Sequence, residues 1–247
     1  MILIIPDIHG RDFWKVPFND IIEKKIQFDE IIFLGDYFDP YSYENINEVD
    51  SIFNCHNLKK TLRKVYWSSP VKLTFLLGNH DFKYVNEDFM KEAGGDKTMM
   101  HTLNEVKGIF KDNMLQFKLA YELEVNGKKI LFTHAGVNKN WYDRHSSLIG
   151  PLTASNLNAL QFTNEGVEAL SEVGYMRGGK CETGGMLWAD VDDNTEKVEP
   201  FDYQIFSHTQ QMKNPIITEN YAMLDCRKPF ILNDEGNIID YETYVKD

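Results

Sequence analysis

The chain has 247 residues, 43% of them hydrophobic, and a formal net charge of −12 at pH 7. A chain of this length can bury a large core without disulfides, and its acidic balance argues against a broad basic surface for nucleic acid. No run approaches the ~20 apolar residues of a membrane span, and three scattered cysteines are typical of reduced thiols in the cytoplasm. We therefore expect a cytoplasmic protein with neither nucleic acid nor membrane as partner. An anionic substrate is not excluded, because a bound cation can reverse the field inside one pocket.

The first third of the chain alternates apolar runs with amphipathic segments. Apolar runs at 2–5, 30–34 and 71–77 predict buried strands, and helical spacing of apolar residues predicts helices over 14–26 and 44–66. Pro17 either starts or kinks the first of these helices. Alternation of this kind predicts βαβ units around a parallel sheet.

The later part of the chain carries shorter strand signals. The Asn126-Gly127 pair predicts a hairpin between strands at 117–125 and 129–133, and we expect antiparallel pairing for the strands that follow, at 203–206, 216–217, 221–224, 230–232 and 238–241. The stretch 141–185 favours helices and glycine-rich loops that cap a site. With no internal repeat or linker, we expect one α/β domain over 1–247, with two packed sheets, outer helices and a capping insertion at about 141–185.

Side chains that can bind metals follow five of the predicted strands. The strand-end sequences are PDIHG, GDYFDP, GNHD, THAG and SHTQ, which supply Asp7, His9, Asp36, Asn79, His134 and His208. In α/β sheets ligands bind at the edge where strands hand over to loops. Carboxylates, imidazoles and one amide suit Mn, Fe or Zn ions better than a cysteine-type structural zinc site. Six ligands exceed the needs of one ion, so we expect two ions bridged by Asp36, which follows the middle strand of the first three.

Taken singly, these residues have ordinary interpretations. Asp36 and Asp39 could form an Asx-turn and a helix N-cap, and His134 and His208 could be hydrogen-bonded histidines at strand ends. Five such motifs in order favour a shared metal site over five coincidences. The other helix and loop histidines are expected outside it: His56, His101 and His145.

The ordered motifs D-x-H, G-D-x-x-D, G-N-H-D, H-A-G and S-H-T resemble the calcineurin-like metallophosphoesterase superfamily, closest to its phosphoprotein phosphatase branch and bacterial relatives. The resemblance spans residues 2–210 and includes MLWAD at 186–190. It implies a four-layer α/β/β/α fold, in which a two-sheet sandwich is flanked by helices. It also implies the division of the ligands between two ions: Asp7 and His9 on the first, Asn79, His134 and His208 on the second, and Asp36 on both.

The resemblance further implies a phosphatase that hydrolyses phosphate monoesters by attack of a hydroxide bridging two divalent ions. His80 would protonate the leaving oxygen while Asp39 orients its imidazole. The phosphorylated substrate would be a small molecule, a nucleotide or a phosphoprotein. Two other functions stay open: hydrolysis of a phosphoric anhydride or diester, as in related bacterial diadenosine tetraphosphate hydrolases, and a non-catalytic scaffold.

The sequence departs from the superfamily pattern at two positions. Pro40 stands where the phosphatase branch has an arginine that binds phosphate, so we expect Arg177 or Arg11 to take over that contact. Many members end in G-H-x-H, whose last histidine completes the first metal site. Here Gln210 occupies that position, and either Gln210 or water would fill the gap.

Overall fold

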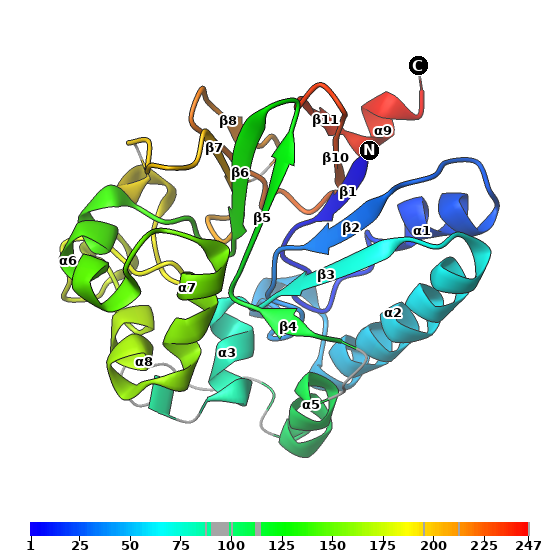
Figure 1. The fold of residues 1–247 in the computed structure, drawn as a ribbon. Helices are drawn as coiled ribbons and strands as arrows, with labels where there is room; N and C mark the ends of the chain where they lie inside the picture. The colour runs from blue at the N-terminus through cyan, green and yellow to red at the C-terminus, as the bar shows by residue number, and fades with distance from the viewer. Residues whose placement is uncertain are drawn as a thin grey trace.

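Two mixed sheets face each other at the centre of the molecule, and helices cover both outer faces (Figure 1). The computed structural model describes residues 1–86, 88–89, 99, 101–111, 115–194, 196–211 and 213–246. The first sheet has the order β11-β10-β1-β2-β3-β4 and the second β5-β6-β7-β9-β8. This arrangement confirms the predicted α/β class with a two-sheet sandwich flanked by helices.

The strands of the first sheet are β1 (Ile2–Ile5), β2 (Glu30–Phe33), β3 (Lys72–Leu76), β4 (Phe117–Lys118), β10 (Phe230–Leu232) and β11 (Ile238–Asp240). Those of the second are β5 (Ala120–Val125), β6 (Lys128–Thr133), β7 (Tyr203–Phe206), β8 (Ile216–Ile217) and β9 (Tyr221–Met223). The α-helices in the described residues are α1 (Lys15–Ile22), α2 (Glu48–Ser68), α3 (Asn79–Val85), α5 (Leu103–Phe110), α6 (Lys139–Ile149), α7 (Ala154–Ala159), α8 (Asn164–Leu170) and α9 (Tyr241–Tyr244). Short 3-10 turns lie at η1 (Ser42–Glu44), η2 (Leu160–Phe162), η3 (Tyr175–Arg177) and η4 (Val191–Asp193).

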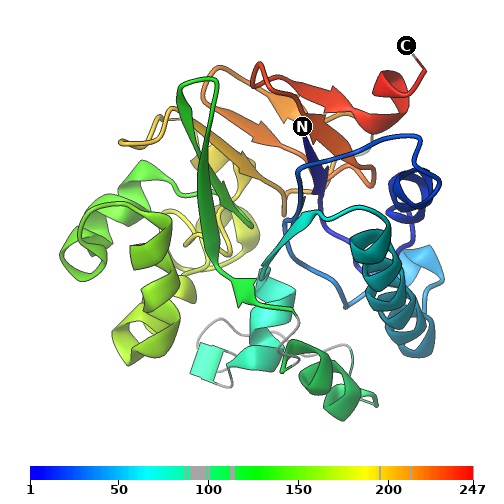
Figure 2. The same ribbon diagram turned by 45° about the vertical axis from the view of Figure 1, so that its right-hand side comes forward.

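Alternation along the central strands builds the layers. In β1, Leu3 and Ile5 pack into a core with α1 and α2, whereas Ile4 packs between the two sheets against Phe132 of β6 and Ile205 of β7. Because successive side chains of a strand point to opposite faces, a strand buried on both faces reads as an unbroken apolar run. The helices α6, α7 and α8 form a third core on the outer face of the second sheet, on the side opposite α1 and α2 (Figure 2). No helix in the described part of the chain combines the length and apolar character needed to cross a membrane.

The predicted parallel order is correct for the first sheet, where β1, β2 and β3 run parallel. The predicted antiparallel pairing is correct for β5 with β6, for β8 with β9, and for β10 with both of its neighbours. It is wrong for β7, which pairs parallel with β6 and with β9. The reason is the long helical connection between β6 and β7, since a crossover of that length returns the chain in the same direction.

The single strand predicted over 117–125 is two strands in two sheets. β4 pairs parallel with β3 in the first sheet, and β5 pairs antiparallel with β6 in the second. The chain changes sheets at Leu119, whose N–H and that of Ala120 both donate to Asn158 Oδ1, at 2.7 and 3.0 Å. Asn158, which lies in α7, therefore fixes the backbone where the chain passes from the first sheet to the second.

Candidate metal centre

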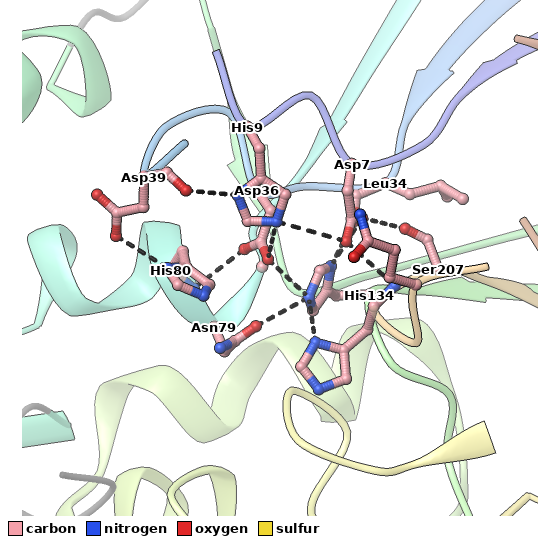
Figure 3. Close-up of polar contacts among 12 residues, drawn as sticks. Asp7, His9, Leu34, Asp36, Asp39, Asn79, His80, His134 and Ser207 are labelled. Carbon is pink, nitrogen blue, oxygen red and sulfur yellow. Dashed lines mark hydrogen bonds and ion pairs between the residues drawn. The ribbon is translucent and has the colours of Figure 1, made fainter. Parts of the chain in front are cut away.

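The six predicted ligand residues converge at one edge of the sandwich, where strands of both sheets end; Figure 3 labels five of them, all except His208. Each is buried, His208 being the most exposed at 7%. Two sets of side chains offer ligand atoms that all lie within 4.8 Å of one another. One set is Asp7, His9 and Asp36, and the other is Asp36, His134 and His208.

Asp36 lies between the two sets. Its Oδ2 is 3.4 Å from His9 Nε2 and 3.4 Å from His134 Nε2, while its Oδ1 accepts a hydrogen bond from the backbone N–H of His80 at 3.0 Å. One carboxylate therefore faces histidines on both sides. This is the position that a bridging ligand between two ions would occupy.

The imidazoles are fixed by backbone carbonyls. His9 Nδ1 lies 2.9 Å from the carbonyl oxygens of both Phe38 and Asp39, and His134 Nδ1 lies 2.9 Å from that of Leu34. A carbonyl only accepts, so each Nδ1 donates, and each Nε2 is directed into the site. Metal-binding histidines are commonly oriented in this way.

Around His134 Nε2 the acceptor atoms crowd together. Asn79 Oδ1 is 3.0 Å away and His208 Nδ1 is 3.1 Å away, in addition to the Asp36 carboxylate. The buried Nε2 atoms of His9 and His208 have no hydrogen-bond partner among the described residues. Lone pairs that converge in this way fit a cation at their centre, and the donor set of oxygens and imidazole nitrogens suits Mn, Fe or Zn.

The carboxylates and histidines shift one another's pKa values. Burial raises the pKa of Asp7, and the nearby carboxylates of Asp225 and Asp36 raise it further. Burial opposes a charge on His134, yet the carboxylates of Asp36 and Asp7 raise its pKa to about 10. Burial lowers the pKa of His9 to about 4, assisted by His80 and Arg11. Without ions, the His134 imidazolium is therefore the cation that offsets the buried carboxylates.

The backbone at the site is held in an uncommon conformation. His9, Asp36, Asp39 and His208 have φ values of 45°, 52°, 59° and 72°. Non-glycine residues seldom adopt this left-handed region, and such strain persists only where the surroundings hold it. Here the strand ends and their hydrogen bonds impose it on four of the candidate site residues.

His80 lies beside the cluster and is more open to solvent, with 26% of its side chain exposed. Its Nδ1 is 2.9 Å from Asp39 Oδ2, and the Tyr84 hydroxyl donates to the other oxygen of Asp39. The His80 ring meets the His9 ring edge-on, with centroids 5.1 Å apart. A carboxylate thus orients an accessible imidazole at the margin of the candidate metal centre.

The two arginines named from the sequence contact different residues around the cluster. Arg177 Nη2 donates to Thr209 Oγ1 at 2.6 Å, and its Nε is 2.9 Å from Asp190. Arg11 is 9% exposed, pairs through Nε with both oxygens of Glu44 at 2.9 Å, and donates from Nη1 to the carbonyl of Asp7 at 3.2 Å. Arg177, a quarter exposed, is the more accessible of the two.

Sequence reasoning missed the residues that hold the ligands in place. Asp81, the last residue of the GNHD motif, was not among the predicted ligands and is fully buried. Its carboxylate accepts from the N–H groups of Asp36 at 2.5 Å, Gly78 at 2.9 Å and Tyr37 at 3.0 Å, so it ties two strand-end loops together. The signal was available, because Asp81 occupies the N3 position of α3, which is suited to a capping box.

Asp7 is held from the other sheet. The Ser207 hydroxyl donates to Asp7 Oδ1, and the backbone N–H of His208 donates to Oδ2 at 3.2 Å. His56, His101 and His145 have no contact with the cluster among the described hydrogen bonds and ion pairs; His145 instead lies 2.9 Å from Glu172.

Comparison with known proteins agrees with this geometry. The family model described as calcineurin-like phosphoesterase matches residues 1–212. The chain belongs to the calcineurin-like phosphoesterase family. Members of this family are metal-dependent phosphoesterases that typically bind two divalent ions, so the protein is a phosphoesterase with a phosphorylated substrate.

Comparison with solved structures finds distant likenesses. The phosphoesterase is similar to a protein provisionally described as a diadenosine tetraphosphatase (15% identity, 96% of this chain and 91% of that chain, TM-score 0.48). It is also similar to hypothetical protein PH1004 from Pyrococcus horikoshii OT3 (9% identity, 100% and 93%, TM-score 0.48) and to the phosphatase domain of the Legionella effector WipB (15% identity, 80% and 77%, TM-score 0.39). No curated protein matches. The family assignment therefore rests on the family model.

Proposed function

We propose that this phosphoesterase is a phosphatase that hydrolyses phosphate monoesters at two divalent ions. The proposed ligands are Asp7, His9 and Asp36 for the first ion and Asp36, Asn79, His134 and His208 for the second. The observation that supports this division is the position of Asp36 Oδ2, equidistant at 3.4 Å from the Nε2 atoms of His9 and His134. Two ions there, Mn, Fe or Zn, would lower the pKa of a water and offset charge on the phosphoryl group.

His80 and Asp39 would assist departure of the leaving group. His80 is accessible, whereas Asp39 beneath it is fully buried and is fixed by Tyr84. With Nδ1 directed to Asp39, the Nε2 of His80 is free to carry a proton to the leaving oxygen. A general acid needs both reach and orientation, and the ion pair supplies the orientation.

Arg177 is the proposed phosphate-binding arginine, with Arg11 second. A monoester dianion carries more charge than a diester, so a guanidinium beside the second half-site favours the monoester. Arg177 contacts the residue after His208, is partly exposed, and comes from the insertion that we propose caps the site. Arg11 already donates hydrogen bonds to the Glu44 carboxylate and to the Asp7 backbone carbonyl, which fits a role in stabilising the loop that carries Asp7.

A substrate panel tests the proposal. Metal-depleted protein is reloaded separately with Mn²⁺, Fe²⁺ and Zn²⁺ and assayed on p-nitrophenyl phosphate, bis-p-nitrophenyl phosphate and a dinucleoside polyphosphate. The monoester should give the largest kcat/KM, and chelation should abolish the activity. Faster cleavage of the diester or of the anhydride would replace the proposal with one of those activities, and an inert metal-loaded protein would favour a scaffold.

The phosphate contact has its own test. Arg177→Met should raise the inhibition constant of inorganic phosphate more than Arg11→Met does. The reverse order would assign phosphate binding to Arg11.

A further inference from the structure

Asp225 is a buried carboxylate at the same sheet edge as the candidate metal centre. It comes two residues after β9, whose Met223 pairs with Phe206 of β7, and the N–H of Leu224 donates to the carbonyl of Phe206 at 2.9 Å. Continuing this register places Asp225 beside His208, which follows Ser207, whose hydroxyl donates to Asp7. Residue 225 lies beyond the segment 1–212 that the family model matches.

The Asp225 side chain has no exposed surface, and neither of its oxygens has a hydrogen-bond partner in the described part of the chain. Buried carboxylates in proteins are paired, hydrogen-bonded or bound to metal. Protonation would not resolve the deficiency, because the resulting O–H would also require an acceptor. The described part of the chain therefore does not supply the hydrogen-bond donor or cation that the buried Asp225 carboxylate requires.

The charges around Asp225 indicate what that partner is. Asp7 and Asp36 add negative charge on one side, while Arg11, Arg227 and His134 are the positive groups that act on Asp225. Both arginines are already paired with Glu44, at 2.9 Å for Arg11 and 3.3 Å for Arg227. A further cation near Asp7 would therefore offset the remaining negative charge of the three buried carboxylates.

Gln210, which the sequence suggested for completing the first half-site, is engaged elsewhere. The Gln210 side chain is 2.7 Å from the Tyr43 hydroxyl. When the oxygen and nitrogen of the Gln210 amide exchange places, the amide oxygen also accepts hydrogen bonds from Arg227. These partners belong to a polar cluster nearer the surface. Another acidic or polar group would therefore have to take the place of the missing last histidine at the first metal site.

We propose that Asp225 belongs to the first metal half-site, where its carboxylate accepts a hydrogen bond from a water bound to the ion beside Asp7 and His9. This inference rests on the proposed two-ion function. The contact is assigned through water because Asp225 is in neither set of ligand atoms lying within 4.8 Å of one another. Such a group raises affinity for the ion by orienting its bound water, and it adds negative charge that favours Mn²⁺.

Titration of metal-free protein with Mn²⁺ alone tests the role, with calorimetry as the readout. Wild type should bind two ions, and Asp225→Asn should weaken one of the two sites by about 10–100-fold, the usual effect of losing such a partner, while leaving the other unchanged. Gln210→Ala and the exposed Asp192→Asn are matched controls and should bind as wild type does. If Gln210→Ala weakens a site and Asp225→Asn does not, the proposal is overturned.

Thermal unfolding of the same proteins separates this role from a structural one. Without metal, Asp225→Asn should be at least as stable as wild type, because it removes an unpartnered buried charge, and its stabilisation by Mn²⁺ should be smaller. A metal-free Asp225→Asn that is less stable or fails to fold would show that Asp225 is structural, which overturns the proposal. A wild-type protein that binds fewer than two ions would instead overturn the two-ion function on which it rests.

Discussion

Replacing His80 with asparagine tests the proposed general acid most directly. The His80 side chain pairs with Asp39 and meets the His9 ring edge-on, and the backbone N–H of His80 donates to Asp36 at 3.0 Å. The substitution keeps that backbone hydrogen bond. We therefore expect His80→Asn to retain both ions and to change KM little while lowering kcat.

The size of the effect depends on the leaving group. General acid catalysis by a positioned side chain contributes about 10²–10⁴-fold, which corresponds to about 3–5 kcal/mol of activation free energy. The whole of this should be lost on an alkyl phosphate, because its leaving alkoxide needs the proton. An aryl phosphate leaves as a stabilised phenolate, so its kcat should fall far less.

The assay compares wild type and His80→Asn on one alkyl and one aryl phosphate, with metal content measured in each preparation. His145→Asn is the matched control, since His145 also pairs with a carboxylate, Glu172 at 2.9 Å, but outside the site. Equal kcat for wild type and His80→Asn on the alkyl phosphate would refute the assignment. So would an equal proportional loss on both substrates, because a general acid must discriminate between leaving groups.

Three further predictions concern the metal centre itself. Gly78→Ala should abolish binding of at least one ion, as measured by metal analysis. The backbone of Gly78 is extended, so alanine causes no backbone strain, but its Cβ would lie within 3.0 Å of the Asp36 carboxylate and displace it. Asp81→Asn should lower the free energy of unfolding in urea by about 2–3 kcal/mol, since one amide oxygen cannot accept from three N–H groups; an unchanged midpoint and slope would contradict this. Metal binding at pH 8 should release close to one proton from His134, because its raised pKa of about 10 keeps the imidazole protonated until an ion replaces the proton. This release of a proton should vanish above pH 10. Calorimetry in buffers of different ionisation enthalpy measures the release.

The sequence indicated which strand-end residues would lie together more fully than it indicated the strand pairing. Each proposed ligand follows an apolar run, and a strand end is a local feature that composition and turn residues define. Asp7, Asp36 and Asn79 come from three neighbouring parallel strands, so their proximity follows from the βαβ pattern alone. That His134 and His208 of the second sheet meet them was expected only from the strand-end pattern that all five motifs share, because the packing of one sheet on another leaves no local signal.

What the sequence did not predict depends on contacts between distant segments. The direction of β7 is set by the helical connection before it, and the change of sheet at Leu119 is held by Asn158, which lies 39 residues away in sequence. The engagement of Gln210 by Tyr43 spans 167 residues. Neither periodicity nor turn propensity reports such pairings, since each side chain is compatible locally with several partners.

The arrangement of the candidate ligands also bears on how the metal-free protein folds. Several of the hydrogen bonds that orient them come from the protein: Ser207 holds Asp7, Asp81 holds the Asp36 loop, and carbonyl groups hold His9 and His134. The repulsion between the Asp7 and Asp36 carboxylates is already overcome when the protein folds, because the His134 imidazolium offsets their charge. An incoming ion must then displace a proton but need not reorganise the loops. Metal binding should therefore be strongly pH-dependent and accompanied by little change in secondary structure, which distinguishes this centre from sites that fold only around their metal.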